Sequence, residues 1–531
     1  MLTKVRVSLK SYFRGPTGKV IEQEDSVLTK SGNADGAMVL GVDLGTGGCK
    51  VCAVGRDGRV GGTCSAAYAT STPKAGWAEQ DPEDWLQALA DATAALLKQT
   101  SIRGEDIAGL ALSSAAHIGV LLDKTGRPAR NAILWSDQRS RDEVDRFEDA
   151  AGNEIFARTG NRISTTWTLP HLAWIARNDK DAWRRTRTIL LSKDYAIYRL
   201  TGRRATDAAT ALSSMLYDAV ENDWSDPLCA LLEITPDILC EILPATAPAG
   251  TLTPEAAERL GLTPGTPVIN GTLDSAAETY GAGVASPGSA LVRLASAGGI
   301  HLVHDGMRPH PRLITYPHPI EPRWFSQAGT STCATSVTWA IRAFTRDRGA
   351  SFEDWDEEAG NVPPGSEGLM FHPYLAGERC PHWDSRLCAS FVGATLRTNS
   401  GHFARAVYEG TAFSIRDALR VVEEVAPLPA SLTVVGGGTR SKLWLRIVCD
   451  CLGRSLDIAD YADSSFGAAL LGMVGLGWFK NPESALASVG ECVEQIDPDD
   501  TNHRLYDELF ERYRDIHERL APIYQSGSSG S

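Results

Sequence analysis

The sequence lacks a long hydrophobic run. None of its segments approaches the 18 or more consecutive apolar residues of a membrane span. It also lacks an excess of basic residues, since its 531 residues carry a net charge of −14 at pH 7. A phosphate backbone would be repelled over most of such a surface. We therefore expect neither a membrane nor a nucleic acid as a partner.

A second CxxC motif is missing as well. Cys49 and Cys52 have this spacing, but the eleven cysteines contain no second pair that would complete a four-thiolate zinc site. In an extended strand these two side chains would point to opposite faces. We expect reduced, packed cysteines, as in a protein of the cytoplasm.

The length of 531 residues is too great for one hydrophobic core, so we expect at least two domains. The two ends are set aside. Residues 526–531, "SGSSGS", are typical of a flexible linker remnant. In residues 1–37, five basic residues precede the first acid, Glu22. A transit peptide looks similar, but this segment is poor in serine and lacks a clear helical period, so we expect a loosely ordered N-terminal extension.

Two parts of the chain open with the same layout. Residues 38–43 and 50–54 are predicted strands joined by Gly45, Thr46, Gly47 and Gly48, and a helix is predicted over residues 81–99. Residues 289–306 repeat the order of strand, small-residue turn and strand. The repeat predicts two related α/β domains, residues 38–283 and 284–525, with a ligand cleft between them.

The first turn presents consecutive backbone N–H groups without side chains over them, a geometry that holds phosphate oxygens. It is not a GxxxxGK[ST] loop, and it joins two strands, unlike the dinucleotide fingerprint. The alternative is a hairpin that needs glycine for positive φ. Asp43 favours phosphate binding, because a carboxylate at the end of an apolar strand needs a partner, and a hydrated Mg²⁺ that bridges phosphates would supply one.

Two later segments have similar alternatives. Asp274 follows a short predicted strand, residues 268–270, which Gly271 should break, and it opens an alanine-rich helix. It is either an N-cap or a general base, and the two roles are compatible. Residues 436–438 are three glycines between a strand and a helix. They either let a flat ring lie against the backbone or make a tight turn.

Together these segments resemble the FGGY carbohydrate kinases, of the superfamily that includes sugar kinases, heat-shock proteins and actin. The resemblance covers residues 38–524. Its motifs occur in the family's order: "GVDLGTGGCK", "GWAEQDPEDW", "HIGVLLD", "ILWSDQRS", "LSKDYAIYRLTG", "TDAATALSSMLYD", "GTLDSAAETYGAG", "YLAGERCPHWD", "GATLRTNSGHFARAVYEGTAF", "VVGGGTRSKLW" and "FGAALLG".

The resemblance implies two actin-like ATPase domains, related to ribonuclease H, and an ATP- and Mg²⁺-dependent kinase for a small sugar. It implies that Asp43 is the Mg²⁺-associated aspartate and that Asp274 is the general base that takes the proton of the acceptor hydroxyl. The positions that match phosphate contacts are Gly45, Thr46, Gly47, Gly48, Lys50 and Ser296. Those that match the adenosine motif are Gly437, Gly438 and Ser441.

The second phosphate loop departs from the family. Pentulose kinases usually have Gly-Thr-Ser-Gly there, and this chain has Ala295, Ser296, Ala297 and Gly298. Ser296 keeps a hydroxyl, whereas Ala297 has lost one. The change affects how the γ-phosphate would be held and leaves the expected type of reaction as it is.

The closest subfamily resembles xylulokinase. His117 keeps the spacing of six residues between the substrate histidine and an aspartate, here Asp123, but Ala116 and Ile118 replace the methionine and glycine of the motif. We expect His117 to contact the sugar; the alternative is a satisfied core histidine. Other positions that border the sugar site in the family are Trp77, Glu79, Gln80, Asp137, Gln138, Arg139 and Ser275, for which loop packing is the alternative.

The expected substrate is a ketopentose such as D-xylulose, followed by another ketose, then a polyol or an aldonate such as gluconate. A non-catalytic sugar-binding regulator of the same fold is the alternative from another class, but it would be expected to lose Asp43 or Asp274, and both are present. A homodimer is left open.

Overall fold

The computed structural model describes residues 8–14, 20–27, 36–345, 351–459, 462–489 and 494–526. The chain divides into two compact units. Unit 1 comprises residues 1–283, 316–321 and 463–490, and unit 2 the segments 284–315, 322–462 and 491–531. Both combine helices and sheets, as the α/β prediction requires. The sequence predicts one boundary after residue 283, whereas this division also assigns residues 316–321 and 463–490 to unit 1.

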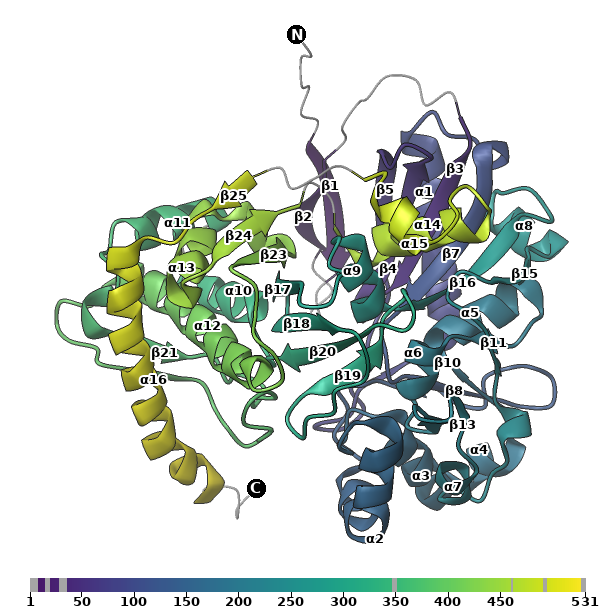
Figure 1. The fold of residues 1–531 in the computed structure, drawn as a ribbon, viewed down its shortest axis with the longest axis horizontal. Helices are drawn as coiled ribbons and strands as arrows, with labels where there is room; N and C mark the ends of the chain where they lie inside the picture. The colour runs from purple at the N-terminus through teal and green to yellow at the C-terminus, as the bar shows by residue number, and fades with distance from the viewer. Residues whose placement is uncertain are drawn as a thin grey trace. The chain divides into compact units, whose positions relative to one another are not determined.

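The N-terminal extension contains two strands for which the sequence showed no signal. Ser8–Arg14 (β1) and Val20–Val27 (β2) pair in antiparallel orientation (Figure 1). The remaining residues before position 36 lie outside the described part of the chain.

Unit 1 is built on a six-stranded sheet. The strands follow the order β15 (Pro248–Thr251), β16 (Pro267–Leu273), β7 (Ile107–Ser114), β3 (Met38–Leu44), β4 (Gly48–Gly55) and β5 (Val60–Ala67). Five two-stranded pairs accompany this sheet in the described part of unit 1. They are β6 (Glu79–Gln80) with β9 (Ala132–Ile133), β8 (Gly119–Leu122) with β10 (Thr188–Leu191), β11 (Ala205–Thr206) with β14 (Glu241–Ile242), β12 (Tyr217–Asp218) with β13 (Asp223–Trp224), and β1 with β2.

The helices of unit 1 come from most of its length. They are α1 (Pro82–Gln99), α2 (Arg141–Thr159), α3 (Thr168–Asn178), α4 (Lys180–Arg185), α5 (Ser192–Thr201), α6 (Ala208–Leu212), α7 (Asp226–Ala230), α8 (Pro254–Leu260), α9 (Asp274–Gly281), α14 (Ser464–Gly475) and α15 (Pro482–Leu486). Local signals explain the predicted α1: Asp81 caps it by accepting from the Glu83 amide, and proline occupies its first turn.

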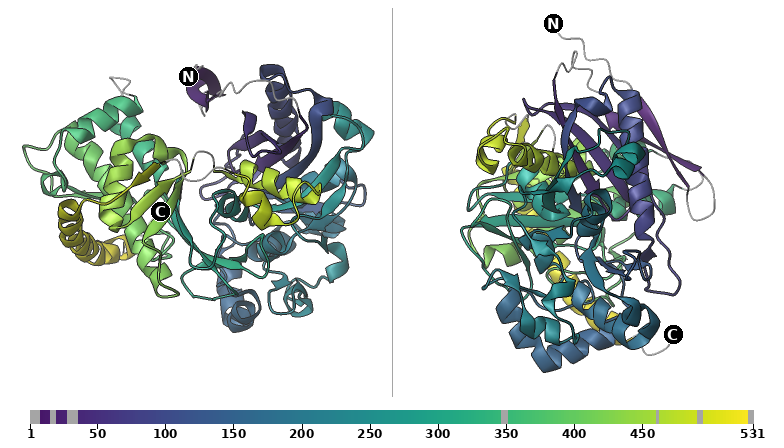
Figure 2. Two further views of the ribbon diagram at one scale, coloured as in Figure 1. Left: turned by 45° about the horizontal axis from the view of Figure 1, so that its top comes forward. Right: turned by 90° about the vertical axis from the view of Figure 1, so that its right-hand side faces the viewer.

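The central strand β3 separates two packed faces, because successive side chains of a strand point to opposite sides. Leu40 and Val42 belong to the core that contains α1. On the other face, a Cβ on Gly41 would overlap the Ser465 carbonyl oxygen, so α14 packs directly on the backbone of β3. Figure 2 shows this late segment, in yellow, among the purple N-terminal elements of unit 1.

Unit 2 is built on a second sheet. Its seven strands follow the order β19 (Ile314–Pro317), β20 (Trp324–Gly329), β18 (Gly298–His304), β17 (Ala290–Leu294), β23 (Ser431–Val435), β24 (Ser455–Ile458) and β25 (Glu494–Ile496). A separate pair is β21 (Met370–His372) with β22 (Ser390–Val392). The helices are α10 (Ala334–Phe344), α11 (Phe352–Gly360), α12 (Ser400–Glu423), α13 (Lys442–Leu452) and α16 (Asp500–Ser526).

The predicted hairpin of the second half is confirmed, since β17 and β18 pair in antiparallel orientation on either side of the small-residue turn. β23 lies beside β17 in parallel, with Arg293 opposite Val435. The turn after β17 and the glycines after β23 therefore meet at one edge of this sheet.

The ten cysteines in the described ranges are free, and most of them are buried. None of the helices in those ranges combines the length and apolar character that a membrane span requires.

Candidate active site

The site in unit 1 is built where parallel strands end. β7 lies between β3 and β16, and all three run parallel. Asp43 is opposite Ser113, and Ser113 is opposite Thr272, two residues before Asp274. The backbones of Asp43 and Thr272 are thus two strand spacings, roughly 10 Å, apart. Carboxyl ends of parallel strands are where open α/β sheets bind ligands.

Asp274 reaches this edge through a kinked strand. Gly271 has φ of +70°, and a Cβ there would overlap the carbonyl of Leu112. The expectation that Gly271 ends the strand is wrong, because β16 continues to Leu273 with a shifted register. Asp274 is the first residue of α9, whose N-cap position is Leu273, and its Oδ1 accepts from the Ser275 amide at 2.7 Å. Ser275 is buried.

Asp43 is surrounded by negative charge. Burial and the neighbouring carboxylates of Asp274, Asp463 and Glu278 together raise its pKa from 3.8 to about 7, against a hydrogen bond from Ser113 that lowers it. That bond joins Ser113 Oγ to Asp43 Oδ1 at 2.8 Å. Four acids converge here, which makes the position attractive to a cation.

The nearby lysine is already paired. Lys50 lies directly opposite Asp43 in the β3–β4 ladder, and its Nζ lies 2.6 Å from Oδ2 of Asp463, which caps α14. Burial opposes the charge of both groups, but the pairing outweighs it, lowering the pKa of Asp463 and raising that of Lys50. The sequence analysis missed Asp463. Its only local signal is that of an N-cap, and its partner is 413 positions away.

The first glycine turn does not need positive φ, so the hairpin alternative loses its reason. Gly45, Gly47 and Gly48 have no positive φ, and a Cβ on Gly47 would meet nothing within 4 Å. Side chains hold the turn instead: Gln80 Nε2 donates to Thr46 O at 2.8 Å, and Trp135 Nε1 donates to Thr46 Oγ1 at 2.9 Å. The backbone at Gly47 therefore borders open space, as phosphate binding requires, whereas the Gly45 amide donates to the Gly48 carbonyl within the turn.

The second small-residue turn lies in unit 2. The amides of Cys333 and Ala334, at the start of α10, donate to the carbonyls of Ser296 and Ala295 at 2.8 and 2.9 Å. Gly298 donates to Thr330 Oγ1 at 3.1 Å. These hydrogen bonds hold the turn through the carbonyls of Ala295 and Ser296 and through the Gly298 amide.

The three glycines of residues 436–438 differ in what they do. Gly436 has φ of +99° and no room for a Cβ, which would lie 2.6 Å from the Leu294 oxygen, and a Cβ on Gly438 would lie 2.7 Å from Trp444. These two are needed by the turn. A Cβ on Gly437 would meet nothing within 4 Å, so of these three glycines only Gly437 has space for a ligand. Ser441 caps α13 by accepting from the Trp444 amide at 3.0 Å.

His117 lies in the loop between β7 and β8, not in a strand as the core alternative assumed, and its φ is +65°. This left-handed conformation is uncommon for a residue other than glycine. Its Nδ1 is 3.1 Å from Ser213 O, and its Nε2 is 2.8 Å from the Tyr316 hydroxyl. Trp167 packs edge-on against the ring at 4.4 Å. Tyr316, from a late segment of unit 1, is a second residue that the sequence analysis missed.

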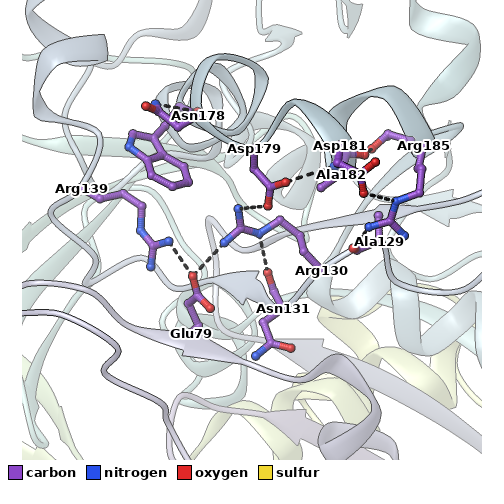
Figure 3. A network of polar contacts seen from close by, with 12 residues as sticks. Glu79, Ala129, Arg130, Asn131, Arg139, Asn178, Asp179, Asp181, Ala182 and Arg185 are labelled. Carbon is purple, nitrogen blue, oxygen red and sulfur yellow. Dashed lines mark hydrogen bonds and ion pairs between the residues drawn. The ribbon is translucent and has the colours of Figure 1, made fainter.

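An ionic network ties together the other residues expected near the sugar. Arg139 donates to Glu79 Oε1 at 2.5 Å, and Arg130 donates to the same oxygen at 2.8 Å and to Asp179 at 3.0 Å (Figure 3). The guanidinium of Arg139 also stacks on Trp77 at 3.7 Å.

Asp137 is a buried member of the same network. Its side chain is 0% exposed and forms two bonds with the Arg139 guanidinium, at 2.7 and 2.9 Å. It also accepts from the amides of Ala78 and Arg139. These contacts agree with loop packing for Asp137, and direct sugar contact by Glu79, Asp137 or Trp77 stays a hypothesis.

The residues around Asp43 fit a divalent cation that is held mainly by the phosphates of a bound ligand. Among the described residues, no group of three or more histidine, cysteine or acidic side chains is arranged to hold a metal. Mg²⁺ commonly takes one or two carboxylates and completes its shell with phosphates and water. Asp43, beside a bare glycine turn and an excess of acids, suits that arrangement.

Comparisons with known proteins agree on one family. Residues 38–281 match the N-terminal domain of the FGGY family of carbohydrate kinases, and residues 298–476 match its C-terminal domain. A xylulose kinase of Bacillus subtilis (strain 168) is 31% identical over 490 residues, which cover 90% of this chain and 96% of that one. A xylulose kinase crystal structure from Brucella ovis aligns with a TM-score of 0.82 at 30% identity, covering 92% of this chain and all of that one. A gluconokinase of Bacillus subtilis is 26% identical over 477 residues, with 88% and 93% coverage.

Proposed function

Since the chain belongs to the FGGY family of carbohydrate kinases, we propose that it transfers the γ-phosphoryl group of ATP to a terminal hydroxyl of a ketopentose such as D-xylulose. The predicted family, the kinase activity and the two-domain actin-like ATPase fold are confirmed. Membership of this family of sugar kinases implies the use of ATP and typically of a divalent metal. Mg²⁺ is our proposal for that metal.

The observation that carries the proposal is the register of β3, β7 and β16, which places Asp43 and Asp274 at one sheet edge. In the proposed reaction, Asp274 accepts the proton of the sugar hydroxyl as that oxygen attacks phosphorus. Its place at the start of α9, with one oxygen held by the Ser275 amide, fixes the carboxylate for this role. Asp43 would hold the Mg²⁺ ion, which would supply positive charge to offset that of the phosphates.

The glycine turns supply the rest of the proposed site. We propose that the 45–48 turn offers backbone N–H groups to phosphate oxygens, with Lys50 and Ser296 as further phosphate contacts, and that Gly437, Gly438 and Ser441 bind the nucleotide. Phosphoryl transfer depends mainly on placement and charge compensation, which such fixed backbone groups can provide.

The substrate is proposed from two supports. Relatives named xylulose kinase match over most of the chain at about 30% identity, and His117 keeps the spacing of the substrate motif. The gluconokinase relative is the reason for keeping aldonates as the second candidate. We also propose a cytoplasmic location.

The test is a coupled ADP-release assay over pentuloses, hexuloses, polyols and aldonates. D-xylulose or another ketopentose should give the highest kcat/KM, and Asp274→Asn, a matched control, should remove the sugar-dependent rate. A higher kcat/KM for gluconate would overturn the ketopentose assignment but keep the kinase. Sugar binding without ADP release for any compound would instead support a non-catalytic regulator.

A further inference from the structure

A polar groove lies between α12 and α16 in unit 2, away from any residue assigned to the proposed reaction. Its cavity has a volume of about 370 Å³. The residues that matter for its chemistry are Arg312, His382, Arg420, Arg514, His517 and Glu518. We call it the α12–α16 groove. The "PHW" part of the "YLAGERCPHWD" motif, which the proposed reaction does not use, forms one wall through Pro381 and His382.

The arginines of this groove keep donors available. Arg312 reaches both oxygens of Glu424 at 2.6 Å, but through one nitrogen, Nη2. Arg514 is held only at 3.8 Å by Asp417 and at 3.5 Å by Glu511. A guanidinium has five N–H donors, so neither side chain has used its full capacity.

Arg420 differs from these two because no ion pair involves it in the part of the chain that the structure describes. Within the described ranges its one charge-related contact is the Phe510 ring, 6.0 Å from its guanidinium carbon. It projects from α12 into the same groove lining as the other two arginines. A cation without a carboxylate partner beside two others favours an anionic ligand.

The three acids of the lining differ in whether a basic side chain already pairs with them. Glu424 is taken by Arg312 and by His310 at 3.2 Å. Asp417 lies 3.3 Å from His382 Nε2 and 3.8 Å from Arg514 Nε. Glu518 is exposed and has no ion pair within the described chain, so it is the acid of the lining whose charge no paired cation offsets.

Two stacked histidines complete the lining. The rings of His382 and His517 stack with centroids 3.8 Å apart. Burial lowers the pKa of His517 to about 4, helped by His382 and His372 and opposed by Asp417 and Asp384. Near neutral pH, His517 therefore contributes an N–H group and no charge.

We propose that the α12–α16 groove binds a phosphate monoester of a small sugar. Three guanidinium groups from separate segments suit the several oxygens of a phosphate better than the two of one carboxylate. The lining is mostly polar and offers no apolar slot for a purine, so a nucleotide fits less well than a hydroxylated ligand. A carbohydrate kinase produces compounds of this class, so the groove would let the protein respond to them. The proposal does not depend on which sugar is the substrate.

The experiment is titration calorimetry on the full chain at low salt, with the kinase site saturated by ADP and the best sugar. The probes are glucose 6-phosphate, inorganic phosphate and unphosphorylated glucose. We expect saturable binding of glucose 6-phosphate, weaker binding of phosphate and none of glucose. Binding of phosphate as tight as that of the ester would overturn the sugar part of the proposal, and no binding of either would overturn the site.

Charge variants of opposite sign make the test specific. Arg420→Gln should weaken glucose 6-phosphate binding by roughly 10-fold or more, the loss of one hydrogen-bonded charge. Glu518→Gln should strengthen it by about 2–5-fold, because it removes an exposed like charge. Arg504→Gln and Glu508→Gln, exposed on α16 outside the lining, should leave it unchanged. Changes of the same sign for Arg420 and Glu518, or equal losses in the controls, would overturn the proposal. Kinase activity should stay at its basal level in all four variants.

Discussion

At the scale of single residues, Asp43 has a role other than stabilising the fold. Its pKa is raised to about 7, so the folded protein takes up a proton there that the unfolded chain, near 3.8, does not hold. That contribution to stability is present at low pH and is lost as the pH rises through about 7. Above pH 7, a charged Asp43 faces three other carboxylates.

Asp43→Asn should therefore raise the melting temperature in the absence of divalent metal, and more at pH 8 than at pH 5. An increase of roughly 2–4 °C at pH 8 corresponds to about 1 kcal/mol. Differential scanning calorimetry with a chelator measures it. Asp463→Asn is the matched control, because the Lys50 pair lowers the pKa of Asp463, and its loss should lower the melting temperature. An equal decrease for both variants would contradict the charge argument.

Asp274 is expected to act in the chemical step. Asp274→Ala should lower kcat by a factor of ~10²–10⁴, the usual share of general-base catalysis, with ATP affinity unchanged. Steady-state kinetics and calorimetry with an ATP analogue measure the two quantities. Turnover near that of the unmodified protein would remove Asp274 from the role of base.

His117 and Tyr316 are expected to hold the sugar as a pair. His117→Ala should reduce kcat/KM for the best sugar by roughly 10–10³-fold, because a polar partner is lost and orientation with it. Tyr316→Phe removes only the hydroxyl at His117 Nε2 and should cost less. Background ATP hydrolysis should change little in both.

His117→Asn serves as the backbone control, because asparagine tolerates the left-handed φ of this position better than alanine. A parallel loss of sugar-dependent and sugar-independent ADP release in all three variants would make His117 a structural residue of its loop.

At the scale of elements, the turn between β23 and α13 separates structure from binding. Gly437→Val should leave the melting temperature almost unchanged, since nothing lies within 4 Å of its Cβ position, but should weaken ATP binding far more than sugar binding. Gly436→Ala should instead destabilise unit 2, because φ of +99° and the Leu294 carbonyl leave no room. Calorimetry with each ligand and thermal melts distinguish them. Equal losses for both ligands in Gly437→Val would contradict a nucleotide role.

Elements with strong local signals were predictable. Proline in the first turn and an apolar stripe predicted α1, and β-rich runs on either side of a glycine turn predicted β3 and β4. The strand β16 was read too short, because a positive-φ glycine looks like a break when the neighbouring strand is unknown. The same holds for His117: its hydrophobic neighbours suggest a strand, and only the packed loop shows its left-handed backbone.

At the scale of the whole molecule, unit 1 is discontinuous, and its sheet depends on a helix from late in the chain. The Ser465 backbone packs against Gly41 of β3, and Gly467 of α14 packs against Ala277 of α9. A fragment of residues 36–283 exposes these faces. It should express poorly or melt without a cooperative transition, as followed by circular dichroism. A cooperative melt close to that of the full chain would show that α14 adds little.

The sequence by itself determined the family, the α/β class, the glycine turns and the two aspartates at strand ends, because each depends on residue types in local order. Tertiary structure decided which charges meet. Lys50 pairs with Asp463, 413 positions later, and Tyr316 reaches His117 across 199 positions. It also decided that Asp137 is enclosed by Arg139, and that Gly437 alone of three glycines faces open space. Such contacts depend on how distant segments pack, and a local pattern cannot encode a partner whose position is set by the folded core.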